Sequence, residues 1–179
     1  MCGGRGTRLD TEREKPLVRV GGEPMVDRVI GALDASSVEG IYAVTSSNAP
    51  ETADHVSVPC IETAGEGYVS DLDAALSAPR IDRPVLTVVA DLTLLDGAVI
   101  DRVLDAHEGG SLTVVVPAAL TDALGVSADT TFEEDGRTVA PTGLNVVGEG
   151  PDRRLCSWDA RLAVNVNYDE DLAVARGLV

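Results

Sequence analysis

The chain has 179 residues, 44% of them hydrophobic, and a formal net charge of −16 at pH 7. This length and composition exclude a disordered chain and predict one domain over residues 1–179. No apolar run is long enough to span a membrane and no signal peptide is visible, so a cytoplasmic protein is expected. The negative charge argues against a nucleic-acid partner, which would be bound by basic patches.

The charged residues are unusual in kind as well as in number. There are 30 acidic residues against 14 basic ones, and Lys15 is the only lysine. A dense acidic surface that avoids lysine is typical of proteins in near-saturating intracellular salt, because salt screens the self-repulsion. The composition therefore predicts a salt-loving microbial source, with an ordinary acidic protein as the alternative. Three distant cysteines and two histidines indicate no zinc site, and the cysteines are expected to be buried.

Apolar, β-branched runs alternate with helical patterns along the chain. Strands are expected at residues 41–45, 58–62, 85–91, 112–117, 144–147 and 162–166, and helices at about 24–34, 69–78, 98–107 and 170–177. Residues 118–142 carry no strong period, and a helix or a hairpin there stays open. This order predicts an α/β fold, a three-layer α/β/α Rossmann-like domain with a mostly parallel central sheet.

The first functional candidate is the glycine-rich segment at the N-terminus. Backbone N–H groups at Gly3, Gly4, Gly6 and Thr7 can ring the oxygens of a triphosphate, since glycine allows close approach. Arg8 and Lys15 can neutralise charge that grows on the phosphates. The segment lacks the GxxxxGK[ST] pattern of a P-loop, and Leu9 stands where a dinucleotide fingerprint needs glycine or alanine. The alternative is a merely flexible N-terminus.

A phosphate loop of this kind normally follows a buried strand, which aims it at the carboxyl edge of the sheet. Here the glycines follow directly after Met1 and Cys2. The expectation is that the first strand is truncated, that Met1 is its last residue, and that a chain extended upstream is more stable and more active.

Polar residues come at or just after the ends of two of the expected strands. Thr45, Ser46 and Asn48 come after the first, where they would sit near a base. Asp91 ends the run at 85–91, so its carboxylate is expected to face the ligand crevice and to hold Mg²⁺ against phosphates. The alternative for Asp91 is a residue that caps the next turn.

The pattern G-G-x-G-T-R-(x)6-K-P-L resembles the signature of nucleotidyltransferases that join a nucleoside triphosphate to a phosphorylated acceptor and release pyrophosphate. Molybdenum-cofactor guanylyltransferases and sugar-phosphate nucleotidyltransferases share it. Segments 45–50, 63–72, 139–147 and 164–172 further resemble the archaeal adenosylcobinamide-phosphate guanylyltransferases, nearly from end to end of the chain.

The resemblance implies that GTP and a phosphorylated corrinoid are the substrates and that Mg²⁺ is the metal. The acceptor phosphate would attack the α-phosphorus itself, so no nucleophilic side chain is needed. Catalytic roles are implied for Arg8, Lys15 and Asp91, with Asp91 as the metal ligand. The implied binding residues are Gly3, Gly4, Gly6 and Thr7 for phosphates, Thr45, Ser46, Asn48, Gly65 and Gly67 for guanine, Pro141, Gly143 and Asn145 for the acceptor, and Asn165 for phosphate or metal.

Two alternatives to the corrinoid enzyme stay open. One is a molybdenum-cofactor guanylyltransferase or another nucleotidyltransferase with a small acceptor. The other is a nucleotide-binding module without catalysis. Tyr68 and Trp158 are the aromatic side chains considered for ligand stacking, and a homodimer is left open.

Overall fold

The structure is a computed structural model that describes residues 1–3, 8–11 and 13–179. In the first half, the elements are η1 (Lys15–Leu17), β1 (Arg19–Val20), β2 (Glu23–Pro24), α1 (Met25–Asp34), β3 (Ala43–Ser46), α2 (Pro50–His55), β4 (Cys60–Thr63) and α3 (Tyr68–Leu76). In the second half, they are β5 (Val85–Val88), α4 (Gly97–Asp105), β6 (Ser111–Pro117), α5 (Ala118–Leu124), β7 (Phe132–Glu134), β8 (Arg137–Val147), β9 (Asp152–Cys156), η2 (Ala160–Leu162) and α6 (Asp169–Gly177).

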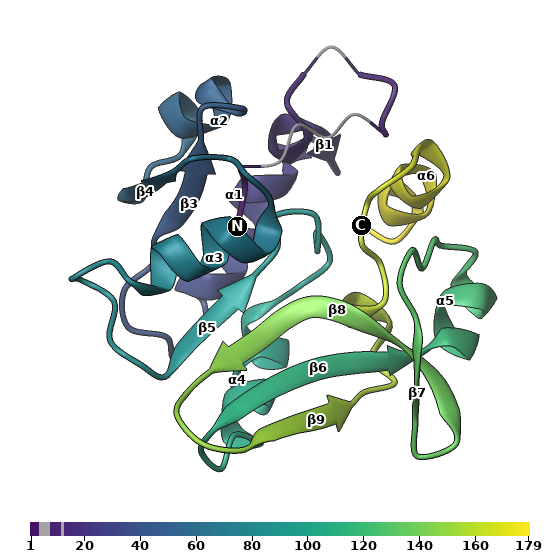
Figure 1. Ribbon diagram of the computed structural model, residues 1–179. Coiled ribbons are helices and arrows are strands. Elements are labelled where there is room, and N and C mark those ends of the chain that lie inside the picture. The colour runs from purple at the N-terminus through teal and green to yellow at the C-terminus, as the bar shows by residue number, and fades with distance from the viewer. Residues whose placement is uncertain (4–7, 12) are drawn as a thin grey trace.

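The strands form two groups that the first residues of the chain join. β3 and β4 pair in parallel, and a second group runs in the order β5-β8-β6-β9, with β7 paired to β8. The Met1 amino group donates to the Val88 carbonyl at 2.8 Å, while the Cys2 N–H donates to the Val44 carbonyl at 2.9 Å. Met1 and Cys2 therefore occupy a strand position between β3 and β5 (Figure 1). The expectation that further strand residues precede Met1 stays a prediction.

Helices cover both faces of the strands and make three layers (Figure 1). The largest core cluster joins α1 and α4 to β6 and β8, with fully buried Ile100, Val114 and Leu144. On the other face, Ala75 of α3 packs against Val44 and Ile61 of β3 and β4. Burial on both faces explains why these strands read as continuous apolar runs.

The sheet is mixed rather than mostly parallel. β8 runs antiparallel to both β5 and β6, between which it lies, whereas β6 and β9 are parallel. An apolar run indicates that a strand is buried, but not in which direction it runs, so the sequence pattern could not give this detail.

Residues 118–142, for which the sequence did not decide between a helix and a hairpin, contain both. α5 occupies its start, and β7 and β8 form a hairpin at its end. The hairpin turns at Asp135 and Gly136, whose φ angles of 48° and 73° are both positive. Such a pair matches the twist of the flanking strands, and Asp-Gly is the dipeptide that favours it.

Two expectations about strands were wrong. Residues 162–166 do not form a strand: they continue from η2 as irregular backbone, apolar because Leu162, Val164 and Val166 are buried in the core. Conversely, β9 was not expected, because this edge strand is mostly exposed and charged.

The cysteines also differ from expectation. Cys2 is buried, and its burial raises the pKa of its thiol, but Cys156 is exposed. Within the described residues, no helix has both the length and the apolar character required to cross a membrane.

Candidate active site

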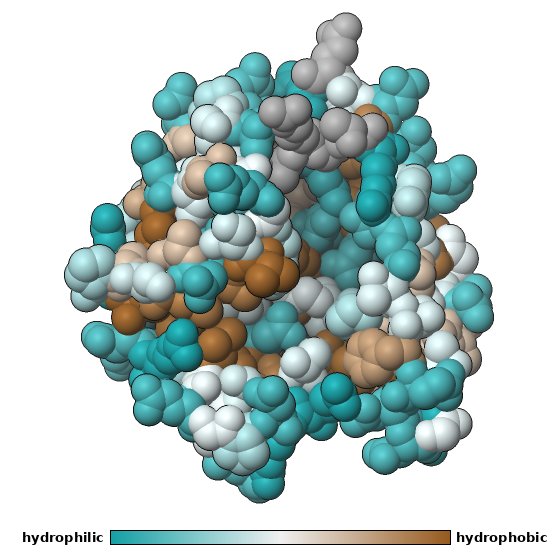
Figure 2. All heavy atoms as spheres, in the orientation of Figure 1, coloured by the Kyte–Doolittle hydropathy of each residue, from teal (hydrophilic) through white to brown (hydrophobic). Residues whose placement is uncertain are grey.

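A pocket of about 480 Å³ opens at the carboxyl ends of β3, β4 and β5, within the usual size of ligand sites. Figure 2 shows the hollow as a hydrophilic recess beside more apolar surface over α3. This edge of an α/β sheet is where ligands are normally bound. The lining residues that carry the argument below are Gly3, Arg8, Lys15, Asn48, Gly65, Gly67, Tyr68, Asp71, Asp91 and Asn167.

Lys15 is held at the floor of this pocket between two oxygens. Its Nζ donates to Oδ2 of Asp91 and, at 2.8 Å, to Oδ1 of Asn167. The side chains of Lys15 and Asp91 are each 18% exposed. A partly desolvated ammonium group in this position can stabilise charge on a phosphate, because the local dielectric is lower than that of water.

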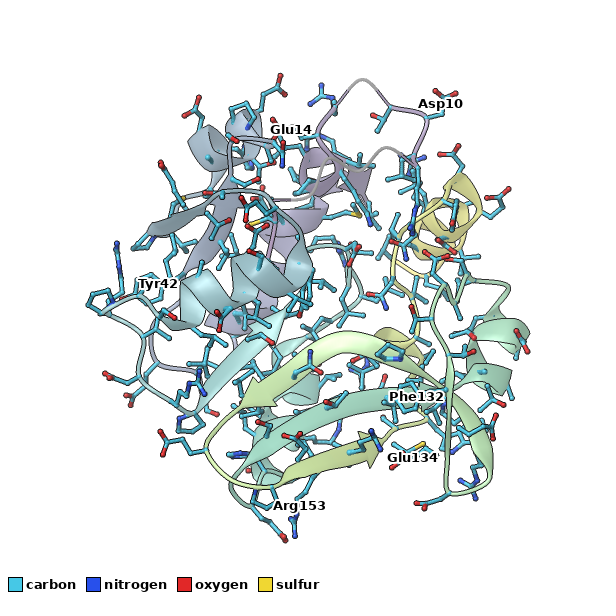
Figure 3. The ribbon with its side chains drawn as sticks, viewed as in Figure 1. Asp10, Glu14, Tyr42, Phe132, Glu134 and Arg153 are labelled. Carbon is cyan, nitrogen blue, oxygen red and sulfur yellow. The ribbon has the colours of Figure 1, made fainter. Side chains whose placement is uncertain are left out.

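The residue before Lys15 fixes the backbone there. The Glu14 carboxylate accepts from the N–H groups of Glu51 at 2.9 Å and Thr52 at 2.7 Å, at the start of α2 (Figure 3). Helix starts leave such N–H groups without partners, and a carboxylate also suits the helix dipole. Glu14 thus ties η1, and with it Lys15, to α2.

Two buried oxygen atoms suitable for a hard cation belong to Asp91, which contacts Lys15, and to Asn165. Oδ1 of Asp91 and Oδ1 of Asn165 are both buried without a hydrogen-bond partner in the part of the chain that the structure describes. Unpaired buried oxygens are costly, and Mg²⁺ is usually bound by one or two carboxylates together with substrate phosphates. No group of three His, Cys, Asp or Glu side chains is gathered for a metal among the described residues. These oxygens therefore fit a Mg²⁺ ion whose remaining ligands come from the phosphates of a bound nucleotide.

A second pocket of about 300 Å³ adjoins the first. Tyr68, Val89, Asp91 and Asn167 line both pockets. A group bound in one pocket would therefore lie next to a group bound in the other, with Asp91 between them. This arrangement suits the joining of two substrates.

The second pocket is lined by the residues predicted for the acceptor, namely Pro141, Gly143 and Asn145, and by Asn165. Gly143 has a φ of 79°, and a Cβ there would lie 2.4 Å from Cγ2 of Val89. The glycine is therefore required by the packing of an irregular part of β8 against Val89, the residue that follows β5. Its further role toward an acceptor stays a prediction.

Burial raises the pKa of the Tyr68 hydroxyl, and interactions with the side chains of Thr87 and Asn145 oppose this rise. Of the two aromatic candidates for ligand contact, Tyr68 lies between the pockets. Trp158 is 62% exposed and lines neither pocket.

Arg8 reaches across the mouth of the two pockets. It pairs with the carboxylate of Asp129, and its guanidinium lies 5.9 Å from the ring centre of Tyr168, whose hydroxyl also donates to Asp129 at 3.1 Å. The Arg8 side chain is 58% exposed, so this ion pair adds little to stability. Arg8 is therefore available to exchange Asp129 for a phosphate.

Some of the predicted guanine-binding residues line the first pocket, and the others lie outside it. Asn48 and Gly65 line the first pocket and are joined, with Nδ2 of Asn48 donating to the Gly65 carbonyl at 3.0 Å. Ser46 lies behind them, where its hydroxyl donates to the Gly3 carbonyl at 2.8 Å. Thr45 is completely buried and lines neither pocket. Gly67 lines the pocket and precedes α3, whereas Gly4, Gly6 and Thr7 lie outside the described residues.

Some residues of the site were not singled out from the sequence. Asn167 belongs to a segment quoted for its resemblance, yet only Asn165 was selected from its Asn-Val-Asn pattern. Asp171 caps the start of α6, and its contacts extend further. The buried Asp171 carboxylate accepts from the N–H groups of Asn167 and Ser127 at 2.9 and 2.7 Å, so it fixes both pockets from behind.

Comparison with known proteins agrees with this geometry. Residues 1–132 match the model of the MobA-like NTP transferase domain. The chain is 27% identical, over its whole length and 95% of the relative, to the adenosylcobinamide-phosphate guanylyltransferase of Methanocaldococcus jannaschii.

Among solved structures, a hypothetical transferase from Thermus thermophilus is similar with a TM-score of 0.68 and 19% identity, covering 88% of this chain and 90% of that one. A putative glucose-1-phosphate thymidylyltransferase from Bacillus anthracis gives a TM-score of 0.69 and 13% identity, covering 99% and 92%. At these identities, the structures support the α/β nucleotidyltransferase fold alone, and they confirm the fold class expected from the sequence. The chain belongs to the MobA-like NTP transferase family.

Proposed function

We propose that this protein is a guanylyltransferase that transfers GMP from GTP to adenosylcobinamide phosphate and releases pyrophosphate. The observation that carries the proposal is the pair of pockets that meet at Asp91 and Asn167, beside the ammonium group of Lys15. The full-length similarity to an archaeal enzyme of that name supports the choice of acceptor.

In the proposed reaction, an oxygen of the acceptor phosphate forms a bond to the α-phosphorus of GTP. The bond from the α-phosphorus to the bridging oxygen breaks, and pyrophosphate leaves with the electron pair. Lys15 stabilises the negative charge that develops on the phosphates. Arg8 breaks its ion pair with Asp129 and binds the triphosphate instead. Asp91 and Asn165 would hold Mg²⁺, which supplies further charge neutralisation and orientation when bound.

The size of the second pocket suggests how a corrinoid would be bound. About 300 Å³ is the lower limit for a drug-sized ligand, so the pocket suits the phosphate-bearing arm and leaves the macrocycle outside. Beside the pocket, Tyr68 is 44% exposed, and Val69, the next residue in α3, is 78% exposed. Large apolar side chains that stay exposed at the rim of a site are suited to contact an apolar ligand. They would pack against the edge of the macrocycle.

The acceptor is tested by offering the protein GTP and Mg²⁺ with adenosylcobinamide phosphate or with molybdopterin, and by measuring the mass of any GMP adduct. We expect an adduct with the corrinoid only, and a Val69→Ser variant with a raised KM for the corrinoid and an unchanged KM for GTP. Turnover of molybdopterin without turnover of the corrinoid would replace the proposed acceptor. GTP binding with no adduct in either case would favour a non-catalytic module.

A further inference from the structure

One buried carboxylate in the first pocket has no part in the proposed chemistry. Asp71 lies in the first turns of α3, is only 7% exposed and lines the pocket. Its Oδ1 accepts from the Gly65 N–H at 2.9 Å. No Lys, Arg or His pairs with it among residues 1–3, 8–11 and 13–179. With one hydrogen bond and no cation, this buried carboxylate keeps free capacity to accept hydrogen bonds from a ligand in the pocket.

The position of Asp71 indicates which part of a nucleotide it faces. Lys15 and Arg8 mark the phosphate end of the pocket, because among the described residues theirs are the basic side chains that line it. Asp71 is bonded instead to the loop after β4, which Asn48 ties to the loop after β3. Without a cation between them, a carboxylate repels a triphosphate. This argues that Asp71 faces the nucleoside end of a bound nucleotide rather than its phosphates.

The backbone around Asp71 is shaped to hold it still. Gly65 has a φ of 73°, which favours glycine, and a Cβ there would lie 3.0 Å from Oγ of Ser46, so glycine suits the close approach of the two loops. The same residue donates its N–H to Asp71, which fixes one carboxylate oxygen. A carboxylate has about four lone-pair positions, so it can accept further hydrogen bonds from a ligand.

We propose that Asp71 is the residue that selects guanine, by accepting hydrogen bonds from N1–H and the 2-amino group of the base. This inference rests on the proposed use of GTP. Guanine presents two donors side by side, and a carboxylate can only accept, so the two edges are complementary. Adenine presents the lone pair of N1 at the same place, and a site whose buried polar group would be left unpaired rejects such a base.

The test measures nucleotide binding by titration calorimetry with Mg²⁺ in molar KCl and without any acceptor. GTP, ITP, XTP and ATP are compared on the wild type, on Asp71→Asn and on Asp73→Asn, which removes an exposed charge from the same helix. For the wild type, we expect GTP to bind about 10-fold or more tighter than ITP, which lacks the 2-amino group. Asp71→Asn should weaken GTP binding by about 10- to 100-fold. It should also raise the affinity for XTP relative to GTP, because an amide can donate to the carbonyl at C2 of xanthine. Asp73→Asn should match the wild type.

An unchanged ratio of GTP to XTP affinity in Asp71→Asn, or an equal loss for all four nucleotides, would overturn the role of Asp71 in base selection. Should Asp71→Asn fail to fold by circular dichroism, 1-methyl-GTP on the wild type decides, and binding as tight as that of GTP would overturn the proposal. A wild type that prefers ATP would instead remove GTP from the proposed function.

Discussion

The only lysine of the chain offers the sharpest test of the phosphate site. We expect Lys15→Met to lower kcat by about 100- to 1,000-fold, the usual effect of removing one group that stabilises a developing oxyanion. The same change leaves the carboxylate of Asp91 without its ammonium partner. Because both side chains are 18% exposed, we expect the free energy of unfolding without ligand to fall by about 1–3 kcal/mol.

Lys15→Arg separates position from charge. The single Nζ of Lys15 contacts Asp91 and Asn167 at once, and a planar guanidinium cannot reproduce this point contact. We therefore expect the arginine variant to keep the charge and still lose about tenfold or more in kcat.

The assay is pyrophosphate release under saturating substrates, with urea unfolding of the same samples. Arg13→Met is the matched control, since it removes an exposed positive charge from the same segment. It should behave as the wild type. Wild-type turnover by Lys15→Met, or full activity of Lys15→Arg, would refute the assignment of Lys15 to the transferring phosphates.

Three further outcomes are expected. The unfolding midpoint should rise steeply between about 0.1 and 2 M KCl, since salt screens a net charge of −16, and a midpoint that does not change would contradict the proposed adaptation to salt. Glu14→Ala should lower the free energy of unfolding by about 1 kcal/mol through loss of the cap on α2, and Glu14→Gln should lower it by less. Equal stability of the wild type and both variants would contradict this capping role. Hydrogen bonds from Arg161 hold the pKa of Asp159 below its usual range, so the stability they give is present above the ordinary carboxylate pKa and is lost as the pH falls through the folded pKa. Denaturation from neutral to acid pH should therefore show a smaller acid loss in Asp159→Asn than in the wild type, and parallel curves would contradict this.

Much of the fold could be predicted because its elements are strongly patterned. Buried strands β3, β5 and β6 appear as apolar β-branched runs, and α1 and α4 as amphipathic helices, each near the expected place. The direction of β8 could not be predicted, since strand direction depends on partners distant in sequence. The exposed edge strand β9 has no apolar pattern. Residues 162–166 have the apolar pattern of a strand without forming one, because burial in the core alone makes them apolar.

The candidate site could be predicted only in part, because a motif shows residues that are near in sequence, whereas the site also depends on contacts made by folding. Motif spacing selected Lys15 and Asp91, and the structure brings them into contact although 76 residues separate them. Motif spacing alone does not reveal that Asn167 also contacts Lys15, or that Thr45 is fully buried and lines neither pocket. The place of Asp71 in the pocket could not be predicted, because an acidic residue in a helix is usually exposed. Only the folded chain shows it buried beside Gly65. The roles of all these residues in binding and catalysis remain predictions.

The most direct test of the proposed function is pyrophosphate release by the wild type in molar KCl with Mg²⁺, GTP and adenosylcobinamide phosphate. Reactions that omit the acceptor or replace GTP by ATP serve as controls, together with Asp91→Asn. We expect release that requires both GTP and the corrinoid and that Asp91→Asn abolishes. Release without the corrinoid, equal release with ATP, or full activity of Asp91→Asn would contradict the proposed reaction or its site.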